Sequence, residues 1–458
     1  MTLVKMTVLK LTTLVLLLAV AFGMLAGCDG GGGGGDQTLR IMMLTNAGSE
    51  LYYSNLFNEL EDEMGITIDY AGYAFQDYNQ KLLLELQNDP PDIFYVRPDQ
   101  IKSLVEDDML ADLTEYIEEN VDTSVLVDTF NTPFRYDGTN VGAETGSVYA
   151  VNGGFSYQGL AYNKAIIDRL RDRFRTSGLK APDELDEDET YTWDEFTRVL
   201  NIVHGASAGG ASGTSPVIGM NIPAGDMLLQ AMMNFGSDIL VDGTVYVDSE
   251  SNRECFNWLL DRKKEGVVSL NASYPEWSGQ TLVFYTTSGS WEMAPYGETD
   301  ASSGVDANAN FMPWPTKTGK YEDTRALIDG AGYGVYKYSD NLELAMEVAT
   351  YFMRAEVLDD LCKRGYGLPM TKSLADGEYL NDANYHPDYK AKKFLTDVVS
   401  GVIGEISPLD NGFSREWYDI TLCADIDSIW NGSTTVDAYL SEKQPEVQAR
   451  YDFYNKVN

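Results

Sequence analysis

Cysteine, histidine and basic side chains are all scarce in this sequence. Its 458 residues include four cysteines and two histidines, and 33 lysines and arginines stand against 71 aspartates and glutamates, a formal net charge of -38. The cysteines form no CxxC pair and no cluster with histidine, which argues against a zinc site. Because so acidic a surface repels phosphate backbones, we expect no nucleic-acid partner.

The common catalytic and phosphate-binding motifs are missing as well. The two histidines, His204 and His386, lie far apart, so a histidine-dependent triad has little support. The glycine-rich stretch 207–216 lacks the Gly-Lys-Ser/Thr ending of a P-loop, and the acidic loop 183–189 lacks the oxygen-ligand spacing of a calcium loop. We therefore predict no catalytic residue, no metal and no cofactor.

Long apolar runs are absent except near the N-terminus. Residues 11–25 form an apolar run that follows Lys5 and Lys10 and leads into the sequence LAGC, which ends at Cys28. A charged, then apolar, then small-residue order is typical of a secretory signal, here residues 1–27. The LAGC sequence resembles the bacterial lipobox, which implies that Cys28 receives a lipid and becomes the mature N-terminus.

A run of six glycines, residues 30–35, follows this cysteine. Such a run behaves as a flexible tether, so residues 28–37 are predicted to be a lipidated cysteine and its linker. If Cys28 carries a lipid, the remaining Cys255, Cys362 and Cys423 allow at most one disulfide. Three buried thiols that pack as small apolar residues are the alternative.

The rest of the chain is long enough to bury a large core. With 44% hydrophobic residues, it is expected to fold as two domains or lobes. Apolar strands and amphipathic helices alternate in its first part, with the pattern strand 38–45, helix 54–64, strand 65–73, helix 77–88 and strand 92–96. This order predicts parallel strands joined by right-handed crossovers.

Ligands of such sheets bind at the carboxyl ends of the strands. Glu50 follows the first strand, Tyr78 follows the second, and Arg97 and Asp99 follow the third. These four side chains are candidate ligand contacts, although each also fits an ordinary solvated loop.

Further motifs follow along the chain. Residues 90–117 place a Pro-Asp strand before a helix that reaches an Asp-Leu pair, and Tyr162-Asn163-Lys164 opens a helix after an apolar strand. Gly289-Ser290-Trp291 stands where a strand gives way to a helix, and the glycine-rich strand 330–338 precedes a helix and a Gly-Leu-Pro segment. In order and spacing these motifs resemble extracellular solute-binding proteins of ABC importers, especially the carbohydrate-binding family that includes maltose-binding protein.

The resemblance implies a two-lobed α/β fold of type II, with a mainly parallel sheet flanked by helices in each lobe and a cleft between the lobes. It divides the chain into residues 38–149 and 311–355 for lobe 1 and residues 150–310 and 356–458 for lobe 2. It also implies that Trp291 and Trp417 stack on a sugar ring.

A pyranose has an apolar C–H face and a rim of hydroxyls, so aromatic platforms suit it together with charged or amide groups. Tyr78 and Tyr333 are further candidate platforms. Gln158 and Asp329 are further candidate polar contacts beside Glu50, Arg97 and Asp99.

Together these features predict a monomeric lipoprotein, held by its lipid at the extracytoplasmic face of the bacterial membrane. It is expected to capture a carbohydrate and pass it to the permease subunits of an ABC importer, without enzymatic activity. A secreted lipoprotein glycoside hydrolase is the alternative, since acids are abundant and that chemistry needs two carboxylates facing one bond. An adhesin, and small solutes other than sugars, also remain open.

Overall fold

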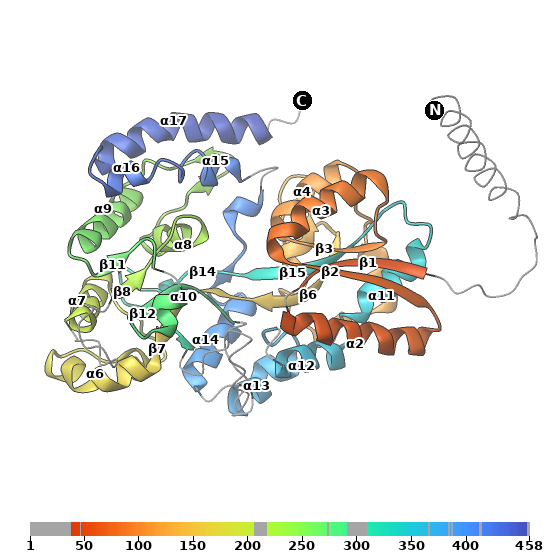
Figure 1. The fold of residues 1–458 in the computed structure, drawn as a ribbon, viewed down its shortest axis with the longest axis horizontal. Helices are drawn as coiled ribbons and strands as arrows, with labels where there is room; N and C mark the ends of the chain where they lie inside the picture. The colour runs from red at the N-terminus through yellow and green to blue at the C-terminus, as the bar shows by residue number, and fades with distance from the viewer. Residues whose placement is uncertain are drawn as a thin grey trace, which may run out of the picture.

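The computed structural model describes residues 38–45, 47–205, 218–272, 274–290, 309–364, 367–382, 385, 388–411 and 415–455. They form two lobes placed side by side, each built around a five-stranded sheet with helices packed against it (Figure 1). The predicted two-lobed α/β architecture is confirmed.

The sheet of the first lobe has the strand order β2-β1-β3-β15-β6. β1, β2 and β3 are parallel, as predicted, whereas β15 runs antiparallel to both β3 and β6. Four of the five strands thus run in one direction, as predicted, and β15 alone is reversed, because it enters the sheet from the other lobe instead of through a helical crossover. The elements of this lobe are β1 (Thr38–Leu44), α2 (Ala47–Met64), β2 (Thr67–Tyr73), α3 (Phe75–Asn88), β3 (Ile93–Val96), α4 (Pro98–Glu106), α5 (Thr114–Asn120), β4 (Arg135–Tyr136), β5 (Ser147–Val148), β6 (Ala150–Ser156), β15 (Asp329–Val335), α11 (Leu342–Tyr351) and α12 (Ala355–Lys363).

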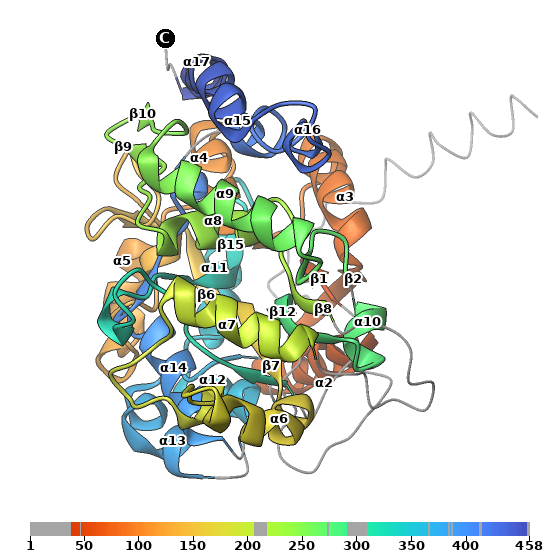
Figure 2. The same ribbon diagram turned by 90° about the vertical axis from the view of Figure 1, so that its left-hand side faces the viewer.

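The second sheet has the order β11-β8-β12-β7-β13 and is mixed in the same way. β11, β8 and β12 are parallel, and β7 runs antiparallel to β12 and β13. Helices α15, α16 and α17 gather at one end of this lobe, where α17 contacts α9 (Figure 2). The elements are β7 (Gln158–Asn163), α6 (Lys164–Thr176), α7 (Trp193–His204), β8 (Ile218–Asn221), α8 (Asp226–Asn234), β9 (Leu240–Val241), β10 (Thr244–Val245), α9 (Glu250–Lys264), β11 (Val268–Ser269), α10 (Tyr274–Ser278), β12 (Leu282–Gly289), β13 (Ala309–Phe311), α15 (Glu416–Asp419), α16 (Asp427–Trp430) and α17 (Val436–Asn455).

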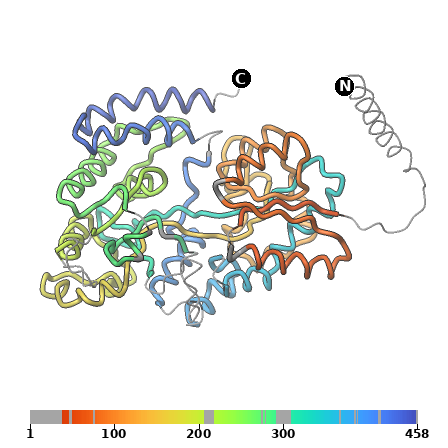
Figure 3. Tube along the Cα trace, in the orientation of Figure 1, coloured from red at the N-terminus to blue at the C-terminus, as the bar shows by residue number. Residues whose placement is uncertain are grey.

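The chain crosses between the two sheets along strands that run through the middle of the molecule (Figure 3). β6 belongs to the first sheet, and after Tyr157 the chain continues directly into β7 of the second sheet. The first sheet thus extends beyond residue 149, where the predicted division between the lobes falls. The chain returns through β14 (Ala326–Leu327), which pairs with β16 (Gly404–Glu405) and leads into β15.

Two further helices follow α12 along the chain. They are α13 (Tyr379–Asn381) and α14 (Tyr389–Val399), and α14 contacts β13 of the second sheet as well as β16. None of the helices in the described part of the chain has both the length and the apolarity needed to cross a membrane.

The three described cysteines are free thiols. Cys255, Cys362 and Cys423 are all buried, so the structure shows the second of the two alternatives left open by the sequence. Burial raises the pKa of the Cys423 thiol to about 11. At neutral pH this side chain is therefore protonated and packs as a small apolar group.

Glycines in β15 let neighbouring aromatic rings approach its backbone. A Cβ atom added to Gly332 would lie 2.6 Å from a ring carbon of Phe134, a side chain with no exposed surface. A Cβ atom added to Gly330 in the same strand would lie 3.5 Å from the ring of Phe155, an ordinary contact distance. Only the first position excludes a side chain.

We predict that Gly332→Ala destabilises the protein by about 1–3 kcal/mol, because the new methyl group forces the buried Phe134 ring or the strand to move. Gly330→Ala is the matched control and should change stability by much less. Chemical denaturation of both variants measures the difference, and equal stabilities would contradict the packing argument.

Candidate functional site

Glu50 lies where β1 and β2 end. Its carboxylate accepts a hydrogen bond of 2.6 Å from the Thr45 hydroxyl, which directly follows β1. The same carboxylate covers Gly72 of β2, where a Cβ atom would come within 2.2 Å of Glu50 Oε2. The glycine therefore makes room for an exposed carboxylate at the carboxyl edge of the first sheet, as predicted from the strand order.

Arg97 and Asp99 lie at the end of β3 and the start of α4. The Arg97 guanidinium pairs with Asp99 Oδ2 at 2.9 Å, and the Arg97 backbone N–H donates to the Gln100 side chain at 3.0 Å. Asp99 Oδ1 is buried and has no hydrogen-bond partner among the described residues. This carboxylate thus retains one acceptor oxygen for a group that the protein does not supply.

Asp329 opens β15 beside these residues. Its carboxylate accepts a hydrogen bond of 2.9 Å from the Gly330 backbone N–H. The side chain reaches solvent, yet protein from both lobes surrounds it, and this surrounding protein raises the pKa of the Asp329 carboxyl while Arg97 opposes the rise. Asp226 of the second lobe raises this pKa further, which shows that the two lobes come close here.

The second lobe contributes a matching group of charges. The Arg415 guanidinium, just before α15, pairs with Asp226 at the start of α8 at 2.6 Å and with Asp419 at 3.2 Å. Burial lowers the pKa of the Arg415 guanidinium, but Asp226 and Asp419 outweigh this effect and raise it. Arg415 is therefore a fixed positive charge held by two carboxylates.

Asp410 lies in the short 3-10 helix η7 (Pro408–Asn411), which packs against α4 of the first lobe. Its side chain is 7% exposed. Burial, followed by repulsion from Asp99, raises the pKa of the Asp410 carboxyl well above its ordinary value, although Arg415 acts in the opposite direction. Charged groups of the two lobes therefore face each other across the contact between α4 and η7.

We refer to these side chains as the interlobe charged cluster. Its members are two arginines and five aspartates from four separate segments of the chain: Arg97, Asp99, Asp226, Asp329, Asp410, Arg415 and Asp419. The strand-end rule found Arg97 and Asp99, and Asp329 was predicted as a polar contact. The sequence prediction missed Asp226, Asp410, Arg415 and Asp419, although Arg415 stands two residues before the predicted Trp417.

Three aromatic residues predicted as sugar platforms are core residues in the structure. Trp417 has no exposed surface, and its ring packs edge-on against Tyr418 and Tyr451 at centroid distances of 5.9 Å and 5.6 Å. Tyr78 is fully buried, and its hydroxyl donates to the Tyr95 carbonyl at 2.7 Å.

Tyr333 is 1% exposed, and its ring stacks on Phe352 at a centroid distance of 4.0 Å. An aromatic ring that stacks on a sugar needs one face open to the ligand. Here protein covers the rings of Tyr78, Tyr333 and Trp417. The structure therefore corrects the prediction that these three rings contact a ligand directly.

Gln158, another predicted polar contact, opens β7 and lies beside the end of β12. Gln158 is half-buried, and its side-chain amide donates to the Thr287 carbonyl at 3.1 Å, while Gln158 pairs with Gly289 across the strands. Trp291 lies outside the described residues. In the described part of the chain, no group of three or more His, Cys, Asp and Glu side chains is arranged to hold a metal ion.

The cluster offers acceptors and donors rather than a reactive centre. The free oxygen of Asp99 accepts hydrogen bonds, and the guanidinium groups of Arg97 and Arg415 donate them. Hydrogen bonds to charged groups are shorter and stronger than neutral ones, so this arrangement suits a ligand with several hydroxyl groups.

Comparisons with known proteins agree with this architecture. Similar solved structures include an ABC substrate-binding protein from Listeria monocytogenes in complex with cycloalternan, 19% identical with a TM-score of 0.68 over 91% of this chain and 99% of that one. The GacH receptor of Streptomyces glaucescens, solved unliganded and with acarbose, is 16% identical with a TM-score of 0.68 over 92% of this chain and 99% of that one.

The sugar-binding protein MalE from Xanthomonas citri is 16% identical, with a TM-score of 0.66 over 91% of this chain and 98% of that one. At these identities the likeness concerns the fold. No curated protein sequence matches the chain. A family model described as bacterial extracellular solute-binding protein, however, matches residues 55–393, which is most of the chain. The protein therefore belongs to the family of bacterial extracellular solute-binding proteins.

Proposed function

We propose that this protein captures an extracellular oligosaccharide between its lobes and delivers it to the permease subunits of an ABC importer. The observation that supports this proposal most is the interlobe charged cluster, in which α4 of the first lobe meets η7 of the second. A ligand bound there contacts both lobes at once. The similar structures in complex with cycloalternan and acarbose agree with a carbohydrate as the ligand class.

The residues of the proposed site are those that the fold brings to the junction. Asp99 accepts from sugar hydroxyls through its free oxygen, and Arg97 and Arg415 donate to hydroxyl and ring oxygens. Glu50, Gln158 and Asp329 provide further polar contacts at the edges of this region. Stacking by Trp291 on a sugar face belongs to the same proposal.

The lipid anchor is a second part of the proposal. The LAGC sequence and the six glycines that follow it support attachment of a lipid to Cys28 and a tether that lets the lobes reorient near the membrane. A monomer at the extracytoplasmic face of the membrane, next to its importer, fits this arrangement.

Binding of an oligosaccharide should depend on the Asp99 carboxylate. Asp99→Asn keeps the shape of the side chain but removes the charge that strengthens its hydrogen bonds, so we expect affinity to fall about tenfold or more. Calorimetric titration with a panel of gluco- and maltooligosaccharides measures this effect. Asp107→Asn, at the exposed far end of α4, removes the same charge and should leave affinity unchanged.

If no oligosaccharide of a broad panel binds the wild type, the carbohydrate proposal fails. If Asp99→Asn binds a verified ligand as tightly as the wild type, Asp99 is not a contact. New reducing ends released from the ligand would instead support the glycoside hydrolase alternative.

Stability should depend on pH through Asp410. Because its folded-state pKa is raised, the stability of the folded protein is undiminished below the unfolded pKa of about 3.9 and falls as the pH rises toward the folded pKa. Asp410→Asn stays neutral, so its melting temperature should exceed that of the wild type at pH 7, and the difference should shrink to nothing near pH 3.5.

The exposed Asp62 provides the control. Asp62→Asn removes one carboxylate without a buried environment, so its stability should follow the wild type across the same pH range. A lower melting temperature for Asp410→Asn at pH 7 would mean that the carboxylate is stabilising and would contradict the assignment.

Metabolic labelling with a fatty acid tests the anchor in a bacterial host. The wild type should be labelled and membrane-bound, and Cys28→Ala should lose both properties. Cys423→Ala, which removes a buried thiol, should remain labelled. Equal labelling of Cys28→Ala and the wild type would rule out the proposed attachment site.

A further inference from the structure

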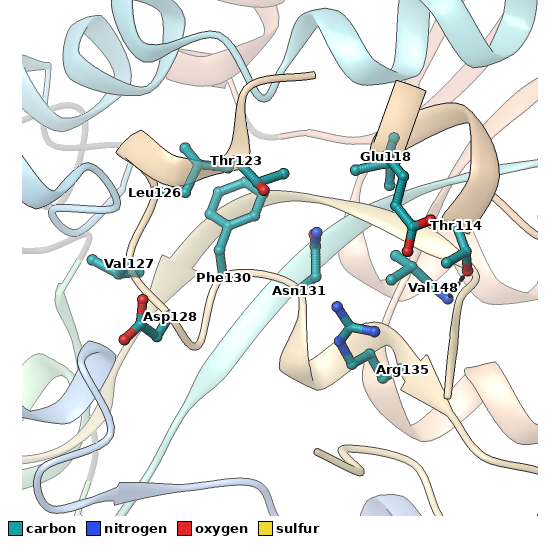
Figure 4. A pocket seen from close by; sticks show the side chains of 11 residues that line it. Thr114, Glu118, Thr123, Leu126, Val127, Asp128, Phe130, Asn131, Arg135 and Val148 are labelled. Carbon is teal, nitrogen blue, oxygen red and sulfur yellow. Dashed lines mark hydrogen bonds between the residues drawn. The ribbon is translucent and has the colours of Figure 1, made fainter. Parts of the chain in front are cut away.

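The first lobe contains a cavity that shares no residue with the interlobe charged cluster (Figure 4). Its volume is about 320 Å³, and it lies between α5 and the short 3-10 helices η1 (Thr123–Val125) and η2 (Thr132–Phe134). Sites for small ligands span roughly 300–1,000 Å³, so the space suits a molecule of about the size of one sugar ring.

The cavity has an apolar floor and a polar rim. Leu126, Phe130 and Val148 on its floor are each 2% exposed. Glu118 and Asp128 on its rim are exposed to solvent. A ligand can therefore enter from solvent and rest against an apolar surface.

Asn131 is the feature that distinguishes this cavity from a surface depression. Asn131 is only 9% exposed, and its side chain points into the space between Phe130 and Glu118 (Figure 4). Its Oδ1 atom is buried and has no hydrogen-bond partner among the described residues. A buried acceptor without a partner destabilises the folded protein, so a hydrogen-bond donor supplied by a ligand would offset that cost.

The wall that carries Asn131 is held in place from several sides. The Val127 backbone N–H donates to the Met370 carbonyl at 2.9 Å, and the Thr129 hydroxyl donates to the Val399 carbonyl. The Asn152 amide on the crossing strand β6 donates to the Phe130 carbonyl at 2.7 Å. Because these hydrogen bonds fix its wall, the cavity is preformed, and little ordering is needed on binding.

The charges around the cavity largely cancel. Asp128 pairs with Lys372 at 3.0 Å, which leaves Glu118 and Arg135 as charges of opposite sign on the rim. The Arg135 guanidinium donates one hydrogen bond, of 2.9 Å, to the Gly146 carbonyl, and points toward the cavity (Figure 4). A neutral environment with several acceptors and one cationic donor favours an uncharged ligand with many hydroxyl groups over an anion or a cation.

We propose that this cavity is a second binding site, which takes a neutral polyol of about the size of a single sugar. A hydroxyl of the ligand donates to Asn131 Oδ1, other hydroxyls bond to Glu118 and Arg135, and the C–H groups of the ligand cover Phe130. The site shares no residue with the interlobe charged cluster, so it can be tested independently of the oligosaccharide proposal.

Hydrogen–deuterium exchange with D-glucose as the probe tests this site. At about 100 mM glucose, roughly a hundredfold above a millimolar Kd, backbone amides in residues 114–131 should exchange more slowly in the wild type. Asn131→Leu should lose this protection, and its melting temperature should not fall, because a buried unsatisfied group has been removed.

A matched pair on α5 keeps the test specific. Glu118→Gln should weaken glucose binding several-fold, whereas Glu119→Gln, the adjacent exposed residue that does not line the cavity, should bind as the wild type does. This pair also carries the test if Asn131→Leu does not fold.

Three outcomes would overturn the proposal. The first is unchanged exchange of residues 114–131 in the wild type, and the second is equal binding by Glu118→Gln and Glu119→Gln. The third is equal protection by glycine, a small zwitterion, which would contradict the choice of a neutral polyol. Protection confined to residues 97–106 would place glucose at the interlobe charged cluster instead and would equally exclude the cavity.

Discussion

The antiparallel pairing of β15 with β3 and β6 is the constraint on which both lobes depend. β3 comes early in the chain, β15 comes after the last strand of the second sheet, and their hydrogen bonds join these distant segments into one sheet. The same pairing fixes β6, which continues into β7 and so sets where the second sheet begins. Because β15 starts at Asp329, the strand that closes the first sheet also delivers a carboxylate to the junction between the lobes.

The carboxylates at that junction outnumber the guanidinium groups, so their mutual repulsion is only partly compensated. Two arginines stand against five aspartates, and burial of Asp410 near Asp99 favours its protonated form. Arg415 is already paired with Asp226 and Asp419, so it cannot fully compensate the carboxylates of the first lobe. A ligand whose hydroxyls donate to these oxygens lowers the cost of bringing the lobes together, and it favours the close arrangement by its differential affinity for that state.

The local part of this structure could be predicted from the sequence, because hydrophobic periodicity depends on neighbouring residues. The strand and helix order through β3 follows from it, and so do Glu50, Arg97 and Asp99 at the strand ends. The pairing of β15, by contrast, joins distant segments and leaves no periodic signal. Asp226, Asp410 and Arg415 were missed for the same reason. No local motif marks these residues, and they come together only when the two lobes pack.

Trp417 shows why a motif gives the position of a residue but not the direction of its side chain. Its place in the sequence agrees with the resemblance, yet α17 brings Tyr451 against its ring and closes it into the core. With Tyr78 and Tyr333 also buried, the predicted contacts that the structure leaves at the junction are the charged side chains Arg97, Asp99 and Asp329. At the proposed site, recognition by these residues would depend on the geometry of hydroxyl groups. The excess of carboxylates over guanidinium groups works against an anionic ligand, since repulsion from Asp99 and Asp329 would add to the cost of removing its charge from water.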